Sequence, residues 1–407
     1  MSDRARRIIE ECLHIASMTE EEGRITRRFL TPPMHNVHAY LAARETELGM
    51  RVSIDAAGNL RGLWESRNPA RNHLIIGSHL DSVPNAGAYD GVLGVVIALE
   101  WIRIAEEIGF DRPIEVIGFS EEEGVRFGVP FIGSRAVAGC FDIELLHLRD
   151  ETGITLEEAI HEFGLDPSQI GQACIDYSVR GFVEVHIEQG PVLDAARLSV
   201  AAVTAIVGQT RGTLTFKGHS NHAGTTPMHL RKDALTAAAE WICSVEDTAN
   251  RTPGLVATTG KIVVDPNAAN VIPGATGVSL DCRHADDTVR TVAVLELLAK
   301  SQAIAEKRSL TVEWIEHMNQ PAVPMDEQLT SMMAEAIRES GFPATRMTSG
   351  AGHDAMIIAQ RMPATMLFLR SPGGISHDPA ETVLAEDIEV SLQVARRFLE
   401  CLVADVG

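Results

Sequence analysis

Histidines and carboxylates recur where apolar segments of this 407-residue sequence end. His79 follows one apolar run, three glutamates (121–123) follow a second, and His186 lies near the end of a third, in VEVHIEQGPVLD. Asp90 precedes a helical pattern, and His377 lies in a glycine-rich loop. Each residue alone has an ordinary explanation, such as a hydrogen-bonded histidine or a helix cap. Together they predict a metal site, because imidazole and carboxylate bind zinc and manganese.

The number of these ligands favours two cations. A tetrahedral ion that keeps an open position does not need three imidazoles and two carboxylates, whereas two ions sharing one carboxylate use all five. Zinc or manganese fits this set, and cobalt or nickel is compatible with it. A cation would also offset the mutual repulsion of Glu121, Glu122 and Glu123. Asp81, two residues after His79, is placed to orient that imidazole from behind.

Other chemistries find little support in the sequence. It has no Gly-x-Ser-x-Gly turn, no HExxH helix and no phosphate-binding loop with lysine. The net charge of −21 argues against nucleic acid, although one arginine could hold an anionic substrate. No apolar run has the length of a membrane span, the first helix lacks the core of a signal peptide, and the six cysteines are scattered. We therefore expect reduced thiols and a cytoplasmic protein.

The elements that must position the histidines read as an α/β sheet. Residues 73–78 form a short apolar strand, 90–109 have helical spacing, and 112–120 read as another strand. Strand, helix and strand at this spacing predict a βαβ unit. Open sheets of this kind bind ligands at the carboxyl ends of their strands, which is where the candidate ligands lie.

The middle of the chain has a different pattern. Strands are expected at 210–218, 255–264, 275–284 and 310–317, with helices at 230–249 and 287–309. This β-α-β-β-α-β order is typical of a ferredoxin-like domain. The α/β pattern returns afterwards, with a helix at 326–341, a strand at 363–369 and a helix at 385–405. We predict a catalytic metal-binding domain (1–207 and 318–407) interrupted by an inserted domain (208–317).

Several longer motifs carry a family resemblance. GSHLDSV, AGAYDGVLG, FSEEEGVRFG, VEVHIEQGPVLD, GQTRGTLTFKGHSNHAGTTPM, NVIPG, DCR, SGAGHDAM and GGISHDPAE follow one another in order. Together they resemble the dinuclear metal amidohydrolases that include allantoate amidohydrolase, N-carbamoyl-L-amino acid hydrolase and β-ureidopropionase. The group belongs to the aminoacylase and metallocarboxypeptidase superfamily. Within it the sequence is most similar to allantoate amidohydrolase, through EEGVRF, VGQTR and PGGISHDPAE.

The resemblance implies roles for individual residues. The metal-ligand positions of the family match His79, Asp90, Glu123, His186 and His377, with Asp90 bridging two ions. Glu122 matches the general base that takes a proton from water. Gln189 matches a residue that holds the substrate. Glu121 receives no role.

Further positions come from the predicted insertion and the chain after it. His222 matches a residue that polarises the scissile carbonyl, and Asn270 and Arg283 match substrate-binding residues. The alternative for Arg283 is an ion pair with a nearby aspartate. Gly352 matches a backbone contact to the substrate, and His353 beside it is expected to support that loop.

The function that this resemblance implies is hydrolysis of the ureido C–N bond of a small anionic N-carbamoyl acid. Allantoate is the expected substrate, within purine catabolism, with release of ammonia and carbon dioxide. N-carbamoyl-L-amino acid hydrolase or β-ureidopropionase is the first alternative, and an aminoacylase or peptidase of the superfamily is the second. Family members are homodimers through the inserted domain, which serves as a lid and dimerisation domain. We therefore expect a homodimer with two divalent ions in each subunit.

Overall fold

The computed structural model describes residues 2–66, 68 and 71–404. The chain divides into two compact units. The first comprises Met1–Thr204 and Met325–Gly407, and the second comprises Ala205–Pro324. The second unit thus begins three residues before the predicted insertion and ends seven residues after it.

The first unit is built on a mixed sheet with the strand order β1-β2-β4-β3-β5-β16-β6-β14 and β15 paired to β6. The strands are β1 (Arg51–Ile54), β2 (Leu60–Trp64), β3 (His73–His79), β4 (Ile114–Phe119), β5 (Val179–Ile187), β6 (Val200–Ile206), β14 (Val323–Pro324), β15 (Arg346–Ser349) and β16 (Ala364–Leu369). The four strands β4, β3, β5 and β16 run parallel. Strands β1, β2 and β6 pair in antiparallel fashion at the flanks. The predicted α/β class with a mixed central sheet is confirmed.

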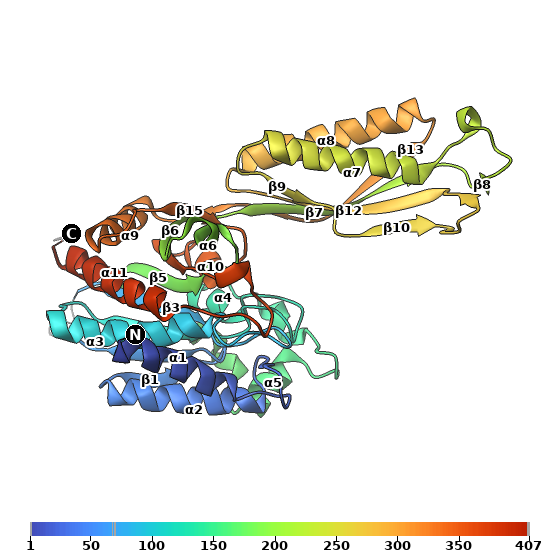
Figure 1. Cartoon of the computed structure of the whole chain (residues 1–407). Helices are drawn as coiled ribbons and strands as arrows, with labels where there is room; N and C mark the ends of the chain where they lie inside the picture. The colour runs from blue at the N-terminus through green and yellow to red at the C-terminus, as the bar shows by residue number, and fades with distance from the viewer. Residues whose placement is uncertain (1, 67, 69–70, 405–407) are drawn as a thin grey trace. The chain divides into compact units, whose positions relative to one another are not determined.

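Helices cover the sheet. They are α1 (Asp3–Ala16), α2 (Pro32–Glu47), α3 (Val92–Ile108), α4 (Ile132–Ala138), α5 (Leu156–Glu162), α6 (Val192–Ala196), α9 (Glu327–Glu339), α10 (Asp354–Ile358) and α11 (Ala385–Ala404). Helices α1, α3 and α11 lie side by side (Figure 1). Their apolar residues join Leu74, Ile76 and Val185 of the sheet in one core. Alternate residues of the strands face the other way, where Phe119 meets Phe182 edge to face at 5.8 Å between ring centroids.

Close packing of α3 on the sheet helps to position the site. A Cβ atom on Gly94 would lie 2.0 Å from the carbonyl oxygen of Val185 in β5. Only glycine lets the first turn of α3 approach that strand so closely. Asp90, just before α3, is thereby brought to the end of β5, where His186 lies.

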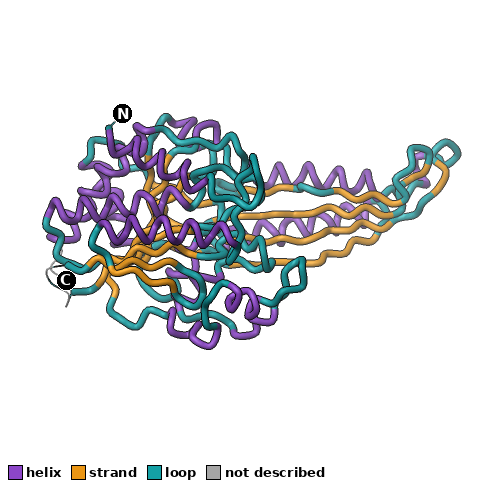
Figure 2. The backbone as a smooth tube through the Cα atoms, turned by 90° about the horizontal axis from the view of Figure 1, so that it is seen from below, coloured by secondary structure: helices purple, strands orange, loops and turns teal. Residues whose placement is uncertain are grey.

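The second unit is a sheet with two helices on one face. Its strands are β7 (Gly208–Lys217), β9 (Val256–Thr258), β10 (Ile262–Asp265), β12 (Ala275–His284) and β13 (Thr311–Gln320), in the order β10-β12-β7-β13 with β9 also paired to β12. All of these pairings are antiparallel. The helices α7 (Ala234–Arg251) and α8 (Asp287–Lys307) enclose the core, in which buried Trp241 donates its indole N–H to the Leu297 carbonyl at 2.9 Å. Figure 2 shows both helices running along the strands.

The strand expected at 255–264 is two strands. β9 and β10 pair with different parts of β12, and residues 259–261, which include Gly260, separate them. A short two-stranded ladder joins β8 (Asn221–His222) to β11 (Val271–Ile272). Among the helices that the structure describes, none is long and apolar enough to cross a bilayer.

Candidate metal centre

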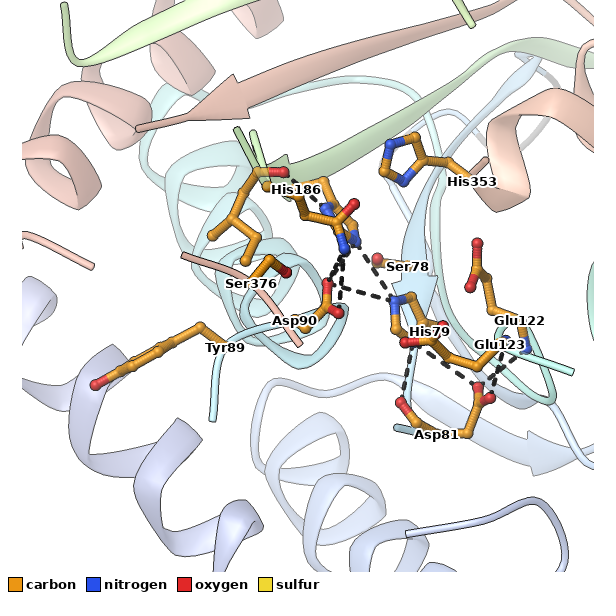
Figure 3. A network of polar contacts seen from close by, with 12 residues as sticks. Ser78, His79, Asp81, Tyr89, Asp90, Glu122, Glu123, His186, His353 and Ser376 are labelled. Carbon is orange, nitrogen blue, oxygen red and sulfur yellow. Dashed lines mark hydrogen bonds and ion pairs between the residues drawn. The ribbon is translucent and has the colours of Figure 1, made fainter. Parts of the chain in front are cut away.

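The parallel strands bring the predicted ligands of the first unit to one edge of the sheet. His79 is the last residue of β3, His186 is the last but one of β5, and Glu122 and Glu123 follow the end of β4. Asp90 precedes α3 and points between the two histidines (Figure 3). This convergence follows from parallel strands ending at the same edge.

The donor atoms lie close together. The Asp90 Oδ1 atom is 3.3 Å from His186 Nε2 and 3.9 Å from His79 Nε2. His377 Nε2 lies 3.2 Å from Asp90 Oδ2 and 3.5 Å from Glu123 Oε1. Within each of three sets, the donor atoms lie no more than 4.8 Å apart: His79, Asp90 and His186; Asp90, Glu123 and His377; and His79, Glu122 and Glu123.

Hydrogen bonding fixes which ring nitrogens face the centre as acceptors. His79 Nδ1 lies 3.0 Å from the backbone carbonyl of Asp81, and His186 Nδ1 lies 2.9 Å from that of Ile187. A carbonyl oxygen only accepts, so each Nδ1 carries the proton, and Nε2 of each neutral ring presents a lone pair. These two Nε2 atoms are 3.4 Å apart and both face the Asp90 carboxylate. Lone pairs and a carboxylate converging in this way form a site for a cation.

The electrostatics of the centre agree with this interpretation. Burial, followed by the charge of Glu123, raises the pKa of Glu122 well above its ordinary value. Burial also raises the pKa of Glu123 to about 7. The Oε1 atom of Glu123 is buried without a hydrogen-bond partner among the described residues. A divalent cation would favour the charged form of both carboxyls, so the donor set fits such an ion.

Asp90 and His377 behave as an ion pair. Burial opposes ionisation of Asp90, but the hydrogen bond from His377 holds its pKa below the ordinary value. The same hydrogen bond raises the pKa of His377 to about 9.

Asp81 differs from its predicted role. Its carboxylate is 3.8 Å from His79 Nδ1, beyond hydrogen-bonding distance, and the backbone carbonyl of Asp81 orients the imidazole instead. The carboxylate accepts the backbone N–H groups of Glu122 and Glu123, each at 3.1 Å. Strand β3 ends at His79, and the chain turns directly after it. The turn places the Asp81 carbonyl next to the His79 ring and directs the Asp81 side chain toward the loop after β4. Asp81 therefore holds the segment that carries the predicted base.

Glu121, which received no role, anchors the continuation of the same loop. It is fully buried, has a φ of +51°, and accepts the backbone N–H groups of Arg126 at 2.8 Å and Phe127 at 3.0 Å through Oε1. A non-glycine residue with a left-handed backbone conformation is uncommon, which indicates that the surrounding contacts determine this conformation.

The other predicted residues of the first unit lie nearby. The Gln189 amide, predicted to hold the substrate, lies 3.0 Å from Asp90 Oδ1. Gly352 is exposed, and a Cβ atom there would lie 2.9 Å from the Phe131 ring. His353 is buried, bonds to Ser349 Oγ at 2.9 Å and meets the His186 ring edge to face at 4.4 Å.

The remaining predicted residues belong to the second unit. His222 and Asn270 are neighbours, because β8 pairs with β11 and Ala223 donates its N–H to the Asn270 carbonyl at 2.9 Å. Arg283 forms a two-pronged ion pair with Asp281, with both nitrogen–oxygen distances at 2.8 Å. The ion-pair alternative for Arg283 is therefore what the structure contains.

Sequence reasoning overlooked two acidic residues beside the centre. Glu184 lies within β5, fully buried, and accepts the Ser78 hydroxyl at 3.1 Å and the Ala355 N–H at 2.8 Å. Its donor atoms also lie within 4.8 Å of those of His186 and His353. Glu381 accepts the backbone N–H of Asp90 at 3.0 Å. The only signals in the sequence were a glutamate inside an apolar strand and the final residue of SHDPAE.

A cavity of about 410 Å³ lies in the first unit at the amino ends of β3 and β4. His79 and His186 lie at the opposite end of the sheet. Two charged residues of the cavity, Arg61 and Glu115, already pair with each other. Arg61 binds Glu115 at 2.9 Å and the Ala173 carbonyl at 2.8 Å. The chemistry therefore identifies the cluster of donor atoms around His79, Asp90 and His186 as the candidate site.

Comparison with known proteins agrees with the geometry. The family described as Peptidase family M20/M25/M40 matches residues 75–400. An N-carbamoyl-L-amino acid amidohydrolase of Geobacillus stearothermophilus is 40% identical over 380 residues, 92% of this chain and 92% of that protein. An allantoate amidohydrolase of Bacillus subtilis strain 168 is 35% identical over 382 residues, 93% of this chain and 92% of that protein.

A solved structure shows the same architecture. The crystal structure of an amidase of the hydantoinase/carbamoylase family from Burkholderia multivorans superposes with a TM-score of 0.90 at 32% identity and covers 97% of both chains. The predicted family resemblance is thereby confirmed. The chain belongs to peptidase family M20/M25/M40, in the group of amidohydrolases that contains the allantoate and N-carbamoyl-L-amino acid amidohydrolases.

Proposed function

We propose that this protein hydrolyses the ureido C–N bond of a small N-carbamoyl acid with the help of two divalent cations, zinc or manganese. The observation that carries the proposal is the convergence of the His79 and His186 Nε2 lone pairs on the Asp90 carboxylate. Glu123 and His377 complete the set of ligands. Bound cations lower the pKa of water and polarise a carbonyl, which is the chemistry that this hydrolysis needs.

Glu122 is the proposed proton carrier. Its carboxyl belongs to the set of donor atoms around His79, and Asp81 fixes its backbone. Glu122 takes the proton of the attacking water and returns it to the leaving nitrogen. Burial raises the pKa of Glu122, and a nearby cation would lower it again, so the cation and the base would act together. The carbamoyl fragment then decomposes to ammonia and carbon dioxide.

His222 is the proposed donor to the substrate carbonyl. The Gly224 N–H donates to His222 Nδ1 at 3.1 Å. The neutral ring therefore carries its proton on the exposed Nε2, which is free to donate to an oxygen as negative charge develops there. Asn270 lies next to His222 and is the second polar group of this subsite.

Geometry within the second unit supports a two-copy site. In the register of β12 and β7, Arg283 lies opposite Gln209 near the start of β7. Strand β8, which carries His222, follows the other end of β7 at Lys217. Eight steps of about 3.3 Å separate Gln209 from Lys217, roughly 26 Å. A small ureido acid cannot reach both His222 and Arg283 of one chain. We therefore propose a homodimer in which one copy supplies His222 and Asn270 and the other supplies Arg283 to the same substrate.

Arg283 is proposed to bind the substrate carboxylate. A guanidinium fork forms two parallel charge-assisted bonds to a carboxylate, as it does here with Asp281. Arg211 also binds Asp281, at 2.9 Å, so Asp281 keeps a cationic partner when Arg283 turns to the substrate.

Two substrate classes remain candidates, and each has an observation in its favour. The EEGVRF and PGGISHDPAE motifs favour allantoate. The 40% identity to an N-carbamoyl-L-amino acid amidohydrolase favours carbamoyl amino acids. The test is ammonia release by the metal-reconstituted protein from allantoate, from a panel of N-carbamoyl-L-amino acids and from dipeptides.

A kcat/KM far higher for allantoate would establish that substrate. Preference for a carbamoyl amino acid would retain the chemistry and change the substrate. Cleavage of dipeptides alone would refute the ureidohydrolase proposal.

A further inference from the structure

Glu381 is the buried residue of an otherwise exposed loop. The residues from His377 to Ala380, and Thr382 after it, are exposed, whereas Glu381 is 5% exposed. Burying a carboxylate is costly unless its oxygens find donors. The donors of Glu381 therefore indicate what its burial achieves.

The donors connect two distant segments of the chain. Glu381 Oε1 accepts the backbone N–H groups of Tyr89 and Asp90, each at 3.0 Å. Its Oε2 accepts the hydroxyl of Ser376 at 3.2 Å. Figure 3 shows Tyr89, Asp90 and Ser376 in the same part of the centre. One carboxylate thus ties the loop before α3 to the residue that precedes His377.

Packing leaves this carboxylate little freedom. A Cβ atom on Gly87 would lie 2.4 Å from both the Cβ and the Oε1 atoms of Glu381. Glycine is required there because any other side chain would displace Glu381. The contact between Gly87 and Glu381 therefore holds the carboxylate under the loop that carries Asp90.

His377 needs such a restraint. Its side chain is 47% exposed, and its backbone has a φ of +55°, a region that non-glycine residues seldom adopt. Its ring nevertheless lies 3.2 Å from Asp90 Oδ2. An exposed residue with an uncommon backbone conformation keeps one position only when neighbouring contacts determine it.

We propose that Glu381 is a positioning residue that locks Asp90 and His377 into one geometry and so determines the affinity of the cation that these two residues share. The inference rests on the proposed metal-dependent function. Glu381 itself does not touch the cation, and it acts through the backbone of Asp90 and through Ser376. Losing such a supporting partner typically weakens metal binding by about 10–100-fold.

The experiment is a cobalt(II) titration of the metal-stripped full-length chain, followed by visible absorption and equilibrium dialysis. Glu381→Ala should weaken both binding events, because both ions share Asp90, with the larger loss, about 10–100-fold, at the ion that His377 also binds. Glu381→Gln should recover most of the loss, because an amide oxygen can accept both backbone N–H groups while its NH₂ group donates to Ser376. In a His377→Ala background, Glu381→Ala should cause a smaller further loss than in the wild type, because the part of its effect that acts through His377 is already gone.

Two further variants complete the test. Asp326→Ala removes a carboxylate that accepts a backbone N–H at the start of α9, far along the chain, and should leave both affinities unchanged. Ser376→Ala removes one contact of Glu381 at a partly exposed position. It should weaken the binding of the ion that His377 holds several-fold. If Glu381→Ala binds both ions with wild-type affinity, the inference is overturned. If Glu381→Ala fails to fold, wild-type affinities in Ser376→Ala overturn it instead. A wild-type chain that binds no cobalt refutes the proposed function itself.

Discussion

A buried glutamate in α2 gives a quantitative prediction about stability. Glu45 is fully buried, and neither of its oxygens has a hydrogen-bond partner among the described residues. Its carboxyl is wedged against β2, where a Cβ atom on Gly62 would lie 2.7 Å from it. Burial, assisted by the charge of Glu115, raises the pKa of Glu45 from 4.5 to about 8. The folded chain therefore binds this proton more tightly than the unfolded chain.

The sign and size of the effect follow from this difference. Between pH 4.5 and pH 8 the folded chain keeps the proton and the unfolded chain releases it, so the contribution of Glu45 to stability falls as the pH rises. Each pKa unit corresponds to about 1.4 kcal/mol, so the full loss is about 5 kcal/mol. Below pH 4.5 both states are protonated and the contribution is complete. We expect Glu45→Gln, which cannot ionise, to escape this loss.

The assay is urea unfolding of wild-type and Glu45→Gln chains at pH 4.5, 6 and 8, followed by circular dichroism. Taking the difference between the two proteins at each pH cancels the other titrating groups. The variant should gain about 3–5 kcal/mol relative to wild type between pH 4.5 and pH 8. Glu47→Gln on the same helix, where the side chain is 60% exposed, should show no such trend. A difference for Glu45→Gln that does not vary with pH would refute the reasoning.

Other predictions concern the centre and the second unit. Glu122→Gln should lower kcat by about 10²–10⁴ with the metal content unchanged, as measured by ammonia release and elemental analysis of one sample. Asp81→Asn leaves one buried N–H of the Glu122–Glu123 segment without an acceptor and should cost about 2–4 kcal/mol in urea unfolding, so wild-type stability would contradict its role. Removing the metal with a chelator should lower the free energy of unfolding of the first unit and leave that of the second unchanged. The expected decrease is about 4 kcal/mol, compared with the protein in a free metal concentration of 1,000 times the Kd. Trp241→Ala should destabilise the second unit by about 3–5 kcal/mol and leave cobalt binding by the first unchanged.

The parallel strands and their ends were predictable from the sequence. Apolar runs that end in His79 and in the glutamates after β4 identify strands by composition and place polar side chains at their carboxyl ends. Parallel pairing then brings these ends together whatever lies between them in the chain. For this reason a local pattern could indicate a site made of residues far apart in sequence.

Contacts that depend on tertiary packing could not be predicted in this way. The spacing of Asp81 and His79 indicated a contact between the Asp81 carboxylate and the His79 ring. The turn after β3 instead places the backbone carbonyl of Asp81 next to the ring. Glu381 and Asp90 are 291 residues apart, and no local periodicity links them. The break between β9 and β10 depends on how each pairs with β12, which the alternating pattern of residues 255–264 does not reveal.

Anomalous X-ray scattering from crystals loaded with manganese would test the proposal that two cations share the Asp90 carboxylate. We expect two anomalous peaks, both within bonding distance of Asp90, one beside His186 and the other beside His377. A single peak, or peaks away from Asp90, would refute the shared site.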